Sequence, residues 1–175
     1  MKKALISLSL LVGITMCAPA HAQLEESAES VKCLADNIYW EARNQSRVSH
    51  MAVAFVVKNR VIDKRFPNTI CEVVYQGPTR KSWKNPSISY PVRNRCQFSW
   101  YCDGKSDEIP EKDKELYEDI KFFASAFLVK HKYLIDFTEG ATHYHAYYVK
   151  PAWAKTKIRT AKIEDHIFYR WEDAN

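Results

Sequence analysis

The chain has 175 residues, of which 46% are hydrophobic and 27% are charged, and its formal net charge is +5. This length suits one domain with a single sizeable core, so the sequence does not require a second domain. The modest positive charge does not by itself indicate nucleic acid binding, and we expect no nucleic acid partner.

The first 22 residues have the pattern of a secretory signal peptide. Lys2 and Lys3 precede an apolar run from residue 4 to about residue 16, and small residues follow up to Ala22. The run is too short to span a bilayer. We expect cleavage after Ala22, which leaves one domain over residues 23–175 with 24 basic and 21 acidic residues. A secreted or periplasmic location follows, with no stable membrane insertion after cleavage.

Four cysteines lie beyond the signal peptide, and an even number in an exported protein indicates disulfide bonds. Three pairings are possible. We favour Cys96 with Cys102, which are close in sequence, and Cys33 with Cys71, which would tie the first helix to the third. A structural zinc site is the alternative, but these cysteines lack the close C-x-x-C pairs of such sites.

Two helices are expected at the start of the domain. The first is capped by Ser27 or Ser30, and Asn44 would end it in a left-handed conformation. Ser46 caps the second helix, whose middle, residues 51–57 (MAVAFVV), is apolar on every side. Such a helix must be surrounded by protein, so we expect it at the centre of the core.

A short helix over residues 70–76 precedes a long loop over residues 77–95. The loop lies in a stretch that has no acidic residue between Glu72 and Asp103. It carries five basic residues with two aromatic residues among them: Arg80, Lys81, Trp83, Lys84, Tyr90, Arg93 and Arg95. Two interpretations stay open, a solvated loop with incidental charge and a substrate-binding loop.

An amphipathic helix is expected over residues 111–133. Its apolar side carries Leu116, Ile120, Phe123 and Phe127. Near the C-terminus, the alternation of small or polar with aromatic residues predicts a strand within residues 141–149 (ATHYHAYYV). Residues 166–171 (HIFYRW) form a second candidate strand.

The first helix carries an acid on its apolar side. At about 100° per residue, Leu34, Ile38 and Glu41 share one narrow stripe, whereas Asp36 and Arg43 face away from it. A buried carboxylate costs free energy unless it is paired or protonated, and apolar surroundings raise the pKa of a glutamate.

Two roles of Glu41 stay open at this point. Glu41 forms a structural ion pair with an arginine such as Arg60, or it donates a proton to a leaving group. Its neighbours Tyr39 and Trp40 are of the kind that line sugar-binding sites, but the same side chains serve in any core.

Six sequence blocks resemble, in order, the successive motifs of the SleB-type cell-wall hydrolase family, and together they cover nearly the whole expected domain. They are YWEAR (39–43), AVAFVVKNRV (52–61), FPNTICEVVYQ (66–76), CQFSWYCDG (96–104), GATHYHAYYVKPAWA (140–154) and DHIFYRW (165–171).

The resemblance implies a lysozyme-like α+β fold, mainly helical with a small antiparallel β-sheet. It implies cleavage of the peptidoglycan glycan strand between N-acetylmuramic acid and N-acetylglucosamine, with Glu41 of the YWEAR block as the catalytic acid. It also suggests that Gln97, Phe98 and Ser99 line the cleft. For Ser99, a local turn hydrogen bond is an equal alternative. We expect a monomer that acts on glycan strands without a cofactor.

The family's reaction is thought to be that of a lytic transglycosylase, in which the 6-hydroxyl of the sugar replaces water. One carboxylate then suffices, first as acid and then as base. Hydrolysis by water stays open, and it needs a second carboxylate about 5 Å or about 6.5 to 9.5 Å away. Asp103 and Glu139 are the candidates from the recognised blocks.

His143 and His145 lie two residues apart and so share one face of a strand. They are candidates to bind sugar, to orient Glu41 or to hold a metal. The rival enzyme is a zinc amidase that cuts the peptide stem, with His143, His145 and His166 as ligands and Glu41 as base, although no HExxH motif occurs. A module that binds peptidoglycan without cleaving it is the non-enzymatic alternative.

Two departures from the family pattern bear on these alternatives. Many members follow EAR with Gly-Glu, where this chain has Asn44 and Gln45. Many also have Glu-Gly-Gln ahead of the buried helix, where this chain has Val48, Ser49 and His50. The missing acid removes a candidate partner from beside Glu41. This loss weakens schemes with two carboxylates and leaves the single-acid scheme untouched.

Overall fold

The computed structural model describes residues 20–171, with side chains from residue 28 onward. The expected signal peptide lies almost entirely outside these residues. Within residues 20–171, no helix combines the length and the apolar character that a membrane span requires.

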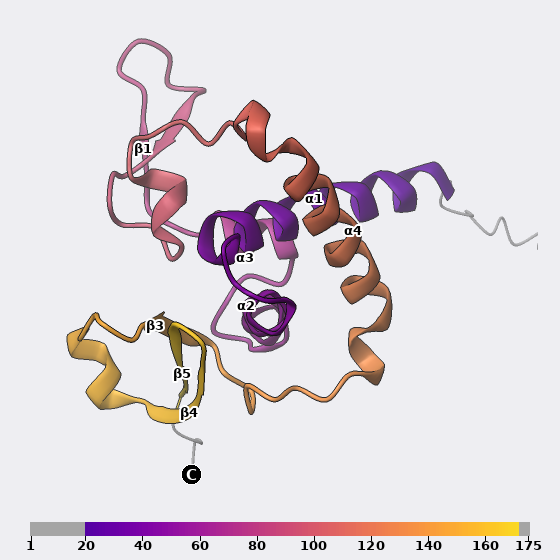
Figure 1. Cartoon of the computed structure of the whole chain (residues 1–175). Coiled ribbons are helices and arrows are strands. Elements are labelled where there is room, and N and C mark those ends of the chain that lie inside the picture. The colour runs from indigo at the N-terminus through magenta and orange to yellow at the C-terminus, as the bar shows by residue number, and fades with distance from the viewer. Residues whose placement is uncertain (1–19, 172–175) are drawn as a thin grey trace, which may run out of the picture.

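Helices form one part of the molecule and a small antiparallel sheet forms the other (Figure 1). The helices are α1 (Ala20–Ala42), α2 (Arg47–Ile62), α3 (Ile70–Val74) and α4 (Lys114–Lys130). The sheet contains β3 (His143–Ala146), β4 (Ile158–Ile163) and β5 (His166–Arg170), in the spatial order β3-β5-β4. Both strand pairings of this sheet are antiparallel.

Helix α2 is the centre of the core, as its sequence predicts. Every residue from Ala52 to Val57 is buried. Phe55 packs against Phe127 of α4, while Ala52 and Val56 pack against Phe168 of β5. The helix is apolar all round because other helices cover one side and the sheet covers the other.

Polar contacts at both ends of α2 hold the sheet against the helices. Ser46 caps the helix, as predicted, and accepts a hydrogen bond from the Val48 N–H. Ser46 and Ser49 also donate to Glu164 in the turn between β4 and β5. Near the other end, Arg60 Nε donates to the Thr142 carbonyl at 2.7 Å, just before β3.

Both favoured disulfides are present. Cys33 is joined to Cys71, which ties α1 to α3, and Cys96 is joined to Cys102. The predicted helix at residues 70–76 is α3, which is capped by Thr69 and ends two residues early. The amphipathic helix over residues 111–133 is also confirmed, although its first and last turns are 3₁₀.

Three predictions about α1 are wrong. The helix begins at Ala20, so neither Ser27 nor Ser30 caps it. Asn44 has no positive φ angle; the helix instead ends in a turn in which the Gln45 N–H donates to the Ala42 carbonyl at 2.9 Å. Asp36 does not face away from protein and is only 7% exposed. It is buried because α3 and α4 both cover α1, so the helix has a wider buried surface than one apolar stripe indicates.

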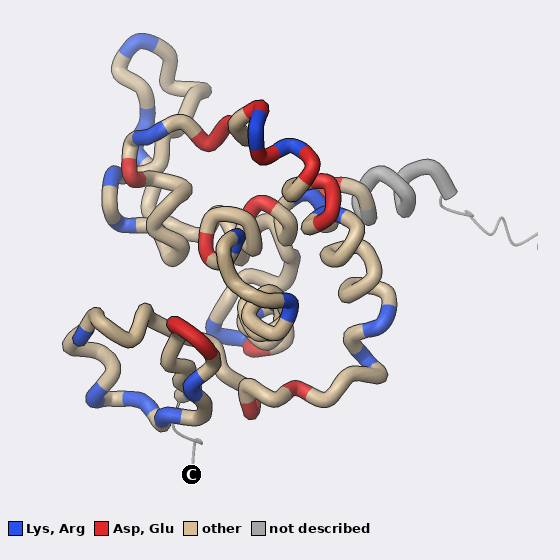
Figure 2. The backbone as a smooth tube through the Cα atoms, in the orientation of Figure 1, with Lys and Arg blue, Asp and Glu red and all other residues tan. Residues whose placement is uncertain are grey.

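The segment 77–95 is not an irregular loop. It contains a hairpin in which β1 (Thr79–Lys81) pairs antiparallel with β2 (Ser89–Pro91), and this hairpin stands out from the body of the molecule (Figure 1). Figure 2 shows basic residues along it and no acidic ones. Strand β4 was also not predicted, because the apolar residues of its sequence IRTAKI do not alternate regularly with the polar ones.

Candidate active site

A cavity of about 690 Å³ opens where the C-terminal end of α1, the segment 97–107 and strand β3 meet. Glu41 and Trp40 line it from α1, and Arg60 lines it from α2. Tyr144 and His145 of β3 form the opposite side. The sheet and the helical part of the molecule therefore both contribute to one cavity, and α2 fixes their relative positions.

Glu41 is partly buried in the wall of this cavity. Loss of water around the carboxyl group raises its pKa to about 7. The Tyr144 hydroxyl, which approaches the carboxylate, and the positive charge of Arg60 both lower the pKa, but burial outweighs them. At neutral pH the side chain is therefore present both as the acid and as the carboxylate.

Arg60 is a buried cation beside Glu41, and it is only 4% exposed. Its guanidinium lies over the rings of Phe66 and Phe98, with 5.1 and 4.9 Å to the ring centroids. Nε donates to the Thr142 carbonyl, whereas Nη1 has no hydrogen-bond partner among residues 28–171. Arg60 therefore attracts the Glu41 carboxylate but forms no direct ion pair with it in the described part of the chain.

Tyr144 and Asn37 complete the polar surroundings of Glu41. Asn37 lies one helical turn before Glu41 and is fully buried, and its side-chain oxygen accepts from Trp100 Nε1 at 3.0 Å. The Tyr144 hydroxyl is buried beside Asn37 and Glu41 and makes no hydrogen bond of good geometry to the described residues. Burial and the Glu41 charge raise the pKa of Tyr144, so it remains a neutral donor.

Gln97, Phe98 and Ser99 all line the cavity, as the resemblance suggested. Gln97 and Ser99 are exposed, whereas Phe98 is buried under Arg60. Beside them, Trp40 and Trp100 stack with 6.3 Å between ring centroids. The wall thus combines amide and hydroxyl groups with flat aromatic surfaces.

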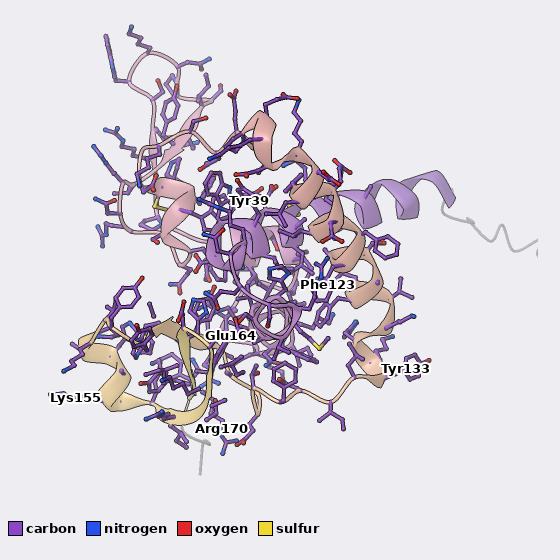
Figure 3. The ribbon with its side chains drawn as sticks, viewed as in Figure 1. Tyr39, Phe123, Tyr133, Lys155, Glu164 and Arg170 are labelled. Carbon is purple, nitrogen blue, oxygen red and sulfur yellow. A yellow bond between two sulfur atoms is a disulfide. The ribbon has the colours of Figure 1, made fainter. Side chains whose placement is uncertain are left out.

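Tyr39 is the predicted substrate-binding residue that the structure does not bring to the cavity. It is fully buried within the helical part of the molecule (Figure 3), and its hydroxyl donates to Asp113 at 2.7 Å. Successive residues of a helix point about 100° apart, so Tyr39 and Glu41 point in nearly opposite directions. The adjacent Trp40 lines the cavity instead.

His143 and His145 lie on the face of β3 opposite to Tyr144. His145 reaches the cavity, whereas His143 lines a smaller adjoining hollow with Trp153. His145 Nδ1 donates to the Ala146 carbonyl, and Nε2 accepts from the Tyr169 hydroxyl. Burial, and then the nearby cations of which Arg60 is the strongest, lower the pKa of His143 to about 3.

His166 lines the cavity, and burial lowers its pKa. In the part of the chain with described side chains, no group of three His, Cys, Asp or Glu residues is arranged to hold a metal ion. The trio proposed for a zinc amidase, His143, His145 and His166, is thus not gathered as a ligand set. His143 and His145 satisfy hydrogen bonds with their neighbours instead.

Of the two candidate second carboxylates, Asp103 lines the cavity and Glu139 does not. Glu139 lies at positive φ in the turn before β3 and is exposed. A further carboxylate, Asp107, lines the cavity, and burial is the main cause that raises its pKa. The cavity therefore holds Glu41 on one wall and two aspartates on the 97–107 segment.

Sequence reasoning missed Asn37, Tyr144 and Asp107. Helical spacing could have indicated Asn37, which is four residues before Glu41 on the same face. The alternation that places His143 and His145 on one face of a strand puts Tyr144 on the other, toward the helices. Asp107 follows the last recognised motif of its region, so no pattern marked it.

Comparisons with known proteins agree with this architecture. The chain is similar to the catalytic domain of the Bacillus cereus SleB protein, with a TM-score of 0.53 and 24% identity over 81% of this chain and 89% of that one. It is equally similar to the catalytic domain of the germination-specific lytic transglycosylase SleB from Bacillus anthracis, where the TM-score is 0.53, the identity 24%, and the coverage 81% and 93%. These likenesses establish the lysozyme-like α+β fold.

No curated protein matches the chain significantly. The family model described as Cell Wall Hydrolase matches residues 44–169, which is most of the chain. The match begins just after Glu41, so the case for Glu41 depends on its position in the cavity. From the extent of the match, the chain belongs to the cell wall hydrolase family.

Proposed function

We propose that the protein degrades peptidoglycan by cleaving the bond between N-acetylmuramic acid and N-acetylglucosamine, as a lytic transglycosylase with Glu41 as its single catalytic acid. The main support is one observation: a carboxyl group with a pKa of about 7 lines a cavity with aromatic and amide walls. Family membership supports a cell-wall substrate. The Bacillus anthracis relative is named as a lytic transglycosylase.

In the first step, protonated Glu41 donates its proton to the glycosidic oxygen. The bond between this oxygen and C1 of the muramic acid breaks, and positive charge develops on the sugar ring. Glu41 becomes a carboxylate as this charge forms. Arg60 and the Tyr144 hydroxyl both favour the carboxylate, so they stabilise the side chain after it has lost its proton.

In the second step, the 6-hydroxyl oxygen of the same sugar attacks C1, and its proton passes to the Glu41 carboxylate. The product carries a 1,6-anhydro end, and Glu41 is again protonated. A pKa near the working pH suits both halves of the cycle, because the residue must give and then regain one proton.

The walls of the cavity suit an N-acetylated sugar chain. Gln97 and Ser99 supply exposed amide and hydroxyl groups for the N-acetyl substituents, and Trp40 supplies an aromatic surface for a sugar ring. His145 reaches the cavity as a further polar group. Tyr39 has no place in this binding scheme because it is buried in the core.

We also infer that the protein acts outside the cytoplasm. Two disulfides are typical of oxidising compartments, and peptidoglycan lies beyond the cytoplasmic membrane. The signal-like sequence of residues 1–22 supports export. Determination of the N-terminus of the mature protein tests this part of the proposal, with Gln23 as the expected first residue.

Mass spectrometry of the soluble fragments released from purified sacculi tests the reaction. We expect glycan fragments with 1,6-anhydro ends. Reducing ends would instead indicate hydrolysis, in which Asp103 or Asp107 activates water. Free stem peptides with intact glycan would indicate an amidase, and undigested sacculi that retain the protein would indicate a binding module.

A further inference from the structure

The hairpin formed by β1 and β2 is unusual because its side chains pack on almost nothing. Residues Thr79–Lys81 are all exposed, and only Pro91 of β2 is partly covered. A two-stranded hairpin of this length buries too little surface to be stable by itself. Its persistence therefore depends on how its base is attached to the protein.

The base of the hairpin is joined to the segment that forms one wall of the cavity. The Val92 N–H donates to the Pro78 carbonyl at 2.8 Å, and the Gln97 N–H donates to the Gln76 carbonyl at 2.9 Å. The Asn94 N–H bonds to the carbonyl of Cys102, whose side chain forms the disulfide to Cys96. The hairpin and the wall carrying Gln97 to Trp100 are thus one connected unit.

The hairpin exposes an aromatic ring and three cationic side chains that are able to bind a ligand. The Trp83 ring is 87% exposed, and the Lys84 ammonium lies 5.3 Å from its centroid. Arg80 and Lys81 are exposed on β1. In the part of the chain with described side chains, none of these three cations forms an ion pair. An exposed large aromatic ring next to unpaired cations is characteristic of a binding surface rather than a packed one.

We propose that this hairpin is a substrate-binding arm that holds the acidic stem peptides of peptidoglycan while the glycan strand lies in the cavity. The proposal depends on the proposed peptidoglycan-cleaving function and names a second part of the same substrate. Stem peptides carry free carboxylates, which Arg80, Lys81 and Lys84 attract, and their side chains offer apolar surface to Trp83. Because the arm shares a base with the cavity wall, it lies beside the glycan that bears these peptides.

The arm is tested with the full mature domain carrying R80Q, K81Q and K84Q together. A matched control carries K130Q, K132Q and R159Q, which remove the same charge from exposed sites elsewhere. Binding and cleavage are measured on intact sacculi and on glycan strands stripped of their peptides, at low and at physiological salt. The arm variant should show an apparent KM on intact sacculi about tenfold higher at low salt, with a weaker salt dependence than the control.

On peptide-free glycan, the arm variant and the control should cleave at the same rate. Equal behaviour of the two variants on intact sacculi would overturn the proposal. A loss of the same size on peptide-free glycan would overturn it too, because the arm would then bind the sugar chain. If the unmodified protein cleaves neither substrate, the proposed function itself fails, and this result is distinct from a failure of the arm alone.

Discussion

Two acidic residues of α1, Asp36 and Glu41, differ in how many polar partners the protein provides for their carboxyl groups. Asp36 accepts hydrogen bonds from Tyr75, at 2.9 Å, and from Tyr117, and it pairs with Lys32 at 2.7 Å. Glu41 has one neighbouring hydroxyl of poor hydrogen-bond geometry and a cation at a distance. The two acids are five residues apart on one helix, yet Asp36 has three polar partners and Glu41 has no hydrogen bond of good geometry to the described residues.

This difference distinguishes an acid that stabilises the fold from an acid that can take part in catalysis. A carboxyl group with three polar partners ties elements together; here Asp36 joins α1 to α3 and α4. A carboxyl group left with few partners in a cavity wall has a raised pKa and can exchange a proton. Burial alone does not indicate function, whereas burial without compensation beside a cavity does.

The largest expected effect comes from Glu41→Gln. The amide cannot donate the proton, so kcat on sacculi should fall by roughly 10²–10⁴-fold, while the circular dichroism spectrum stays unchanged. The matched control is Glu29→Gln, the same substitution on the exposed part of the same helix. Retention of kcat in Glu41→Gln would make Glu41 a structural residue like Asp36.

Asp36→Ala should have the converse effect. Two tyrosine hydroxyls and one lysine lose their common partner, which should lower the free energy of unfolding by about 3 kcal/mol. Denaturant titration measures this loss, and kcat well below the melting temperature should change little. Glu118→Ala, which removes an exposed ion pair, should cost less than about 1 kcal/mol. Equal free energies of unfolding of the two variants would contradict the structural role of Asp36.

The pH dependence of stability tests the raised pKa of Glu41. The pKa of Glu41 rises from its ordinary value of 4.5 to about 7 on folding, so the folded protein binds this proton more tightly than the unfolded chain. Its contribution is therefore complete below pH 4.5 and is lost as the pH rises through 7.

Glutamine cannot titrate, so Glu41→Gln should match the unmodified protein in stability at pH 4 and exceed it by about 3 kcal/mol above pH 8. Guanidinium unfolding of both proteins at several pH values, with the disulfides intact, measures this difference. A stability difference that is constant with pH would contradict the raised pKa.

The smallest expected effect is that of Tyr144→Phe. The hydroxyl favours the Glu41 carboxylate, so its removal should raise the pKa of Glu41 further. The basic limb of the pH profile of kcat/KM should then move to higher pH by less than about one unit. Tyr75→Phe removes a hydroxyl that bonds Asp36, and it should leave the profile in place. A shift in both variants, or in neither, would contradict this role of Tyr144.

Local patterns predicted most of the helical part of the molecule. The all-round apolar stretch around Val53 indicated a central helix, the Ser46 cap indicated where it begins, and cysteine spacing favoured the disulfide pairing that is present. The burial of Asp36 could not be predicted, because its partners are 39 and 81 residues away in sequence. The hairpin was missed because its residues alternate in no apolar pattern and pack on no core.

Local patterns also predicted part of the candidate site. An acid on the apolar side of a helix indicated Glu41, and the recognised motif indicated Gln97, Phe98 and Ser99. Tyr39 was assigned to the site from its residue type, but its direction on the helix places it in the core. Helical spacing puts Asn37 on the same face as Glu41, but the approach of Tyr144 from β3 to these two residues joins distant segments and has no local sequence signal.

A measurement of the pKa of Glu41 tests most directly whether this residue is the proton donor. Nuclear magnetic resonance titration of ¹³C-labelled glutamate side chains, with Glu41→Gln to assign the signal, measures it without substrate. We expect a midpoint near pH 7 for Glu41. A midpoint at the ordinary value of 4.5 would mean that the carboxyl group is fully charged at neutral pH, and it would contradict its role as the proton donor.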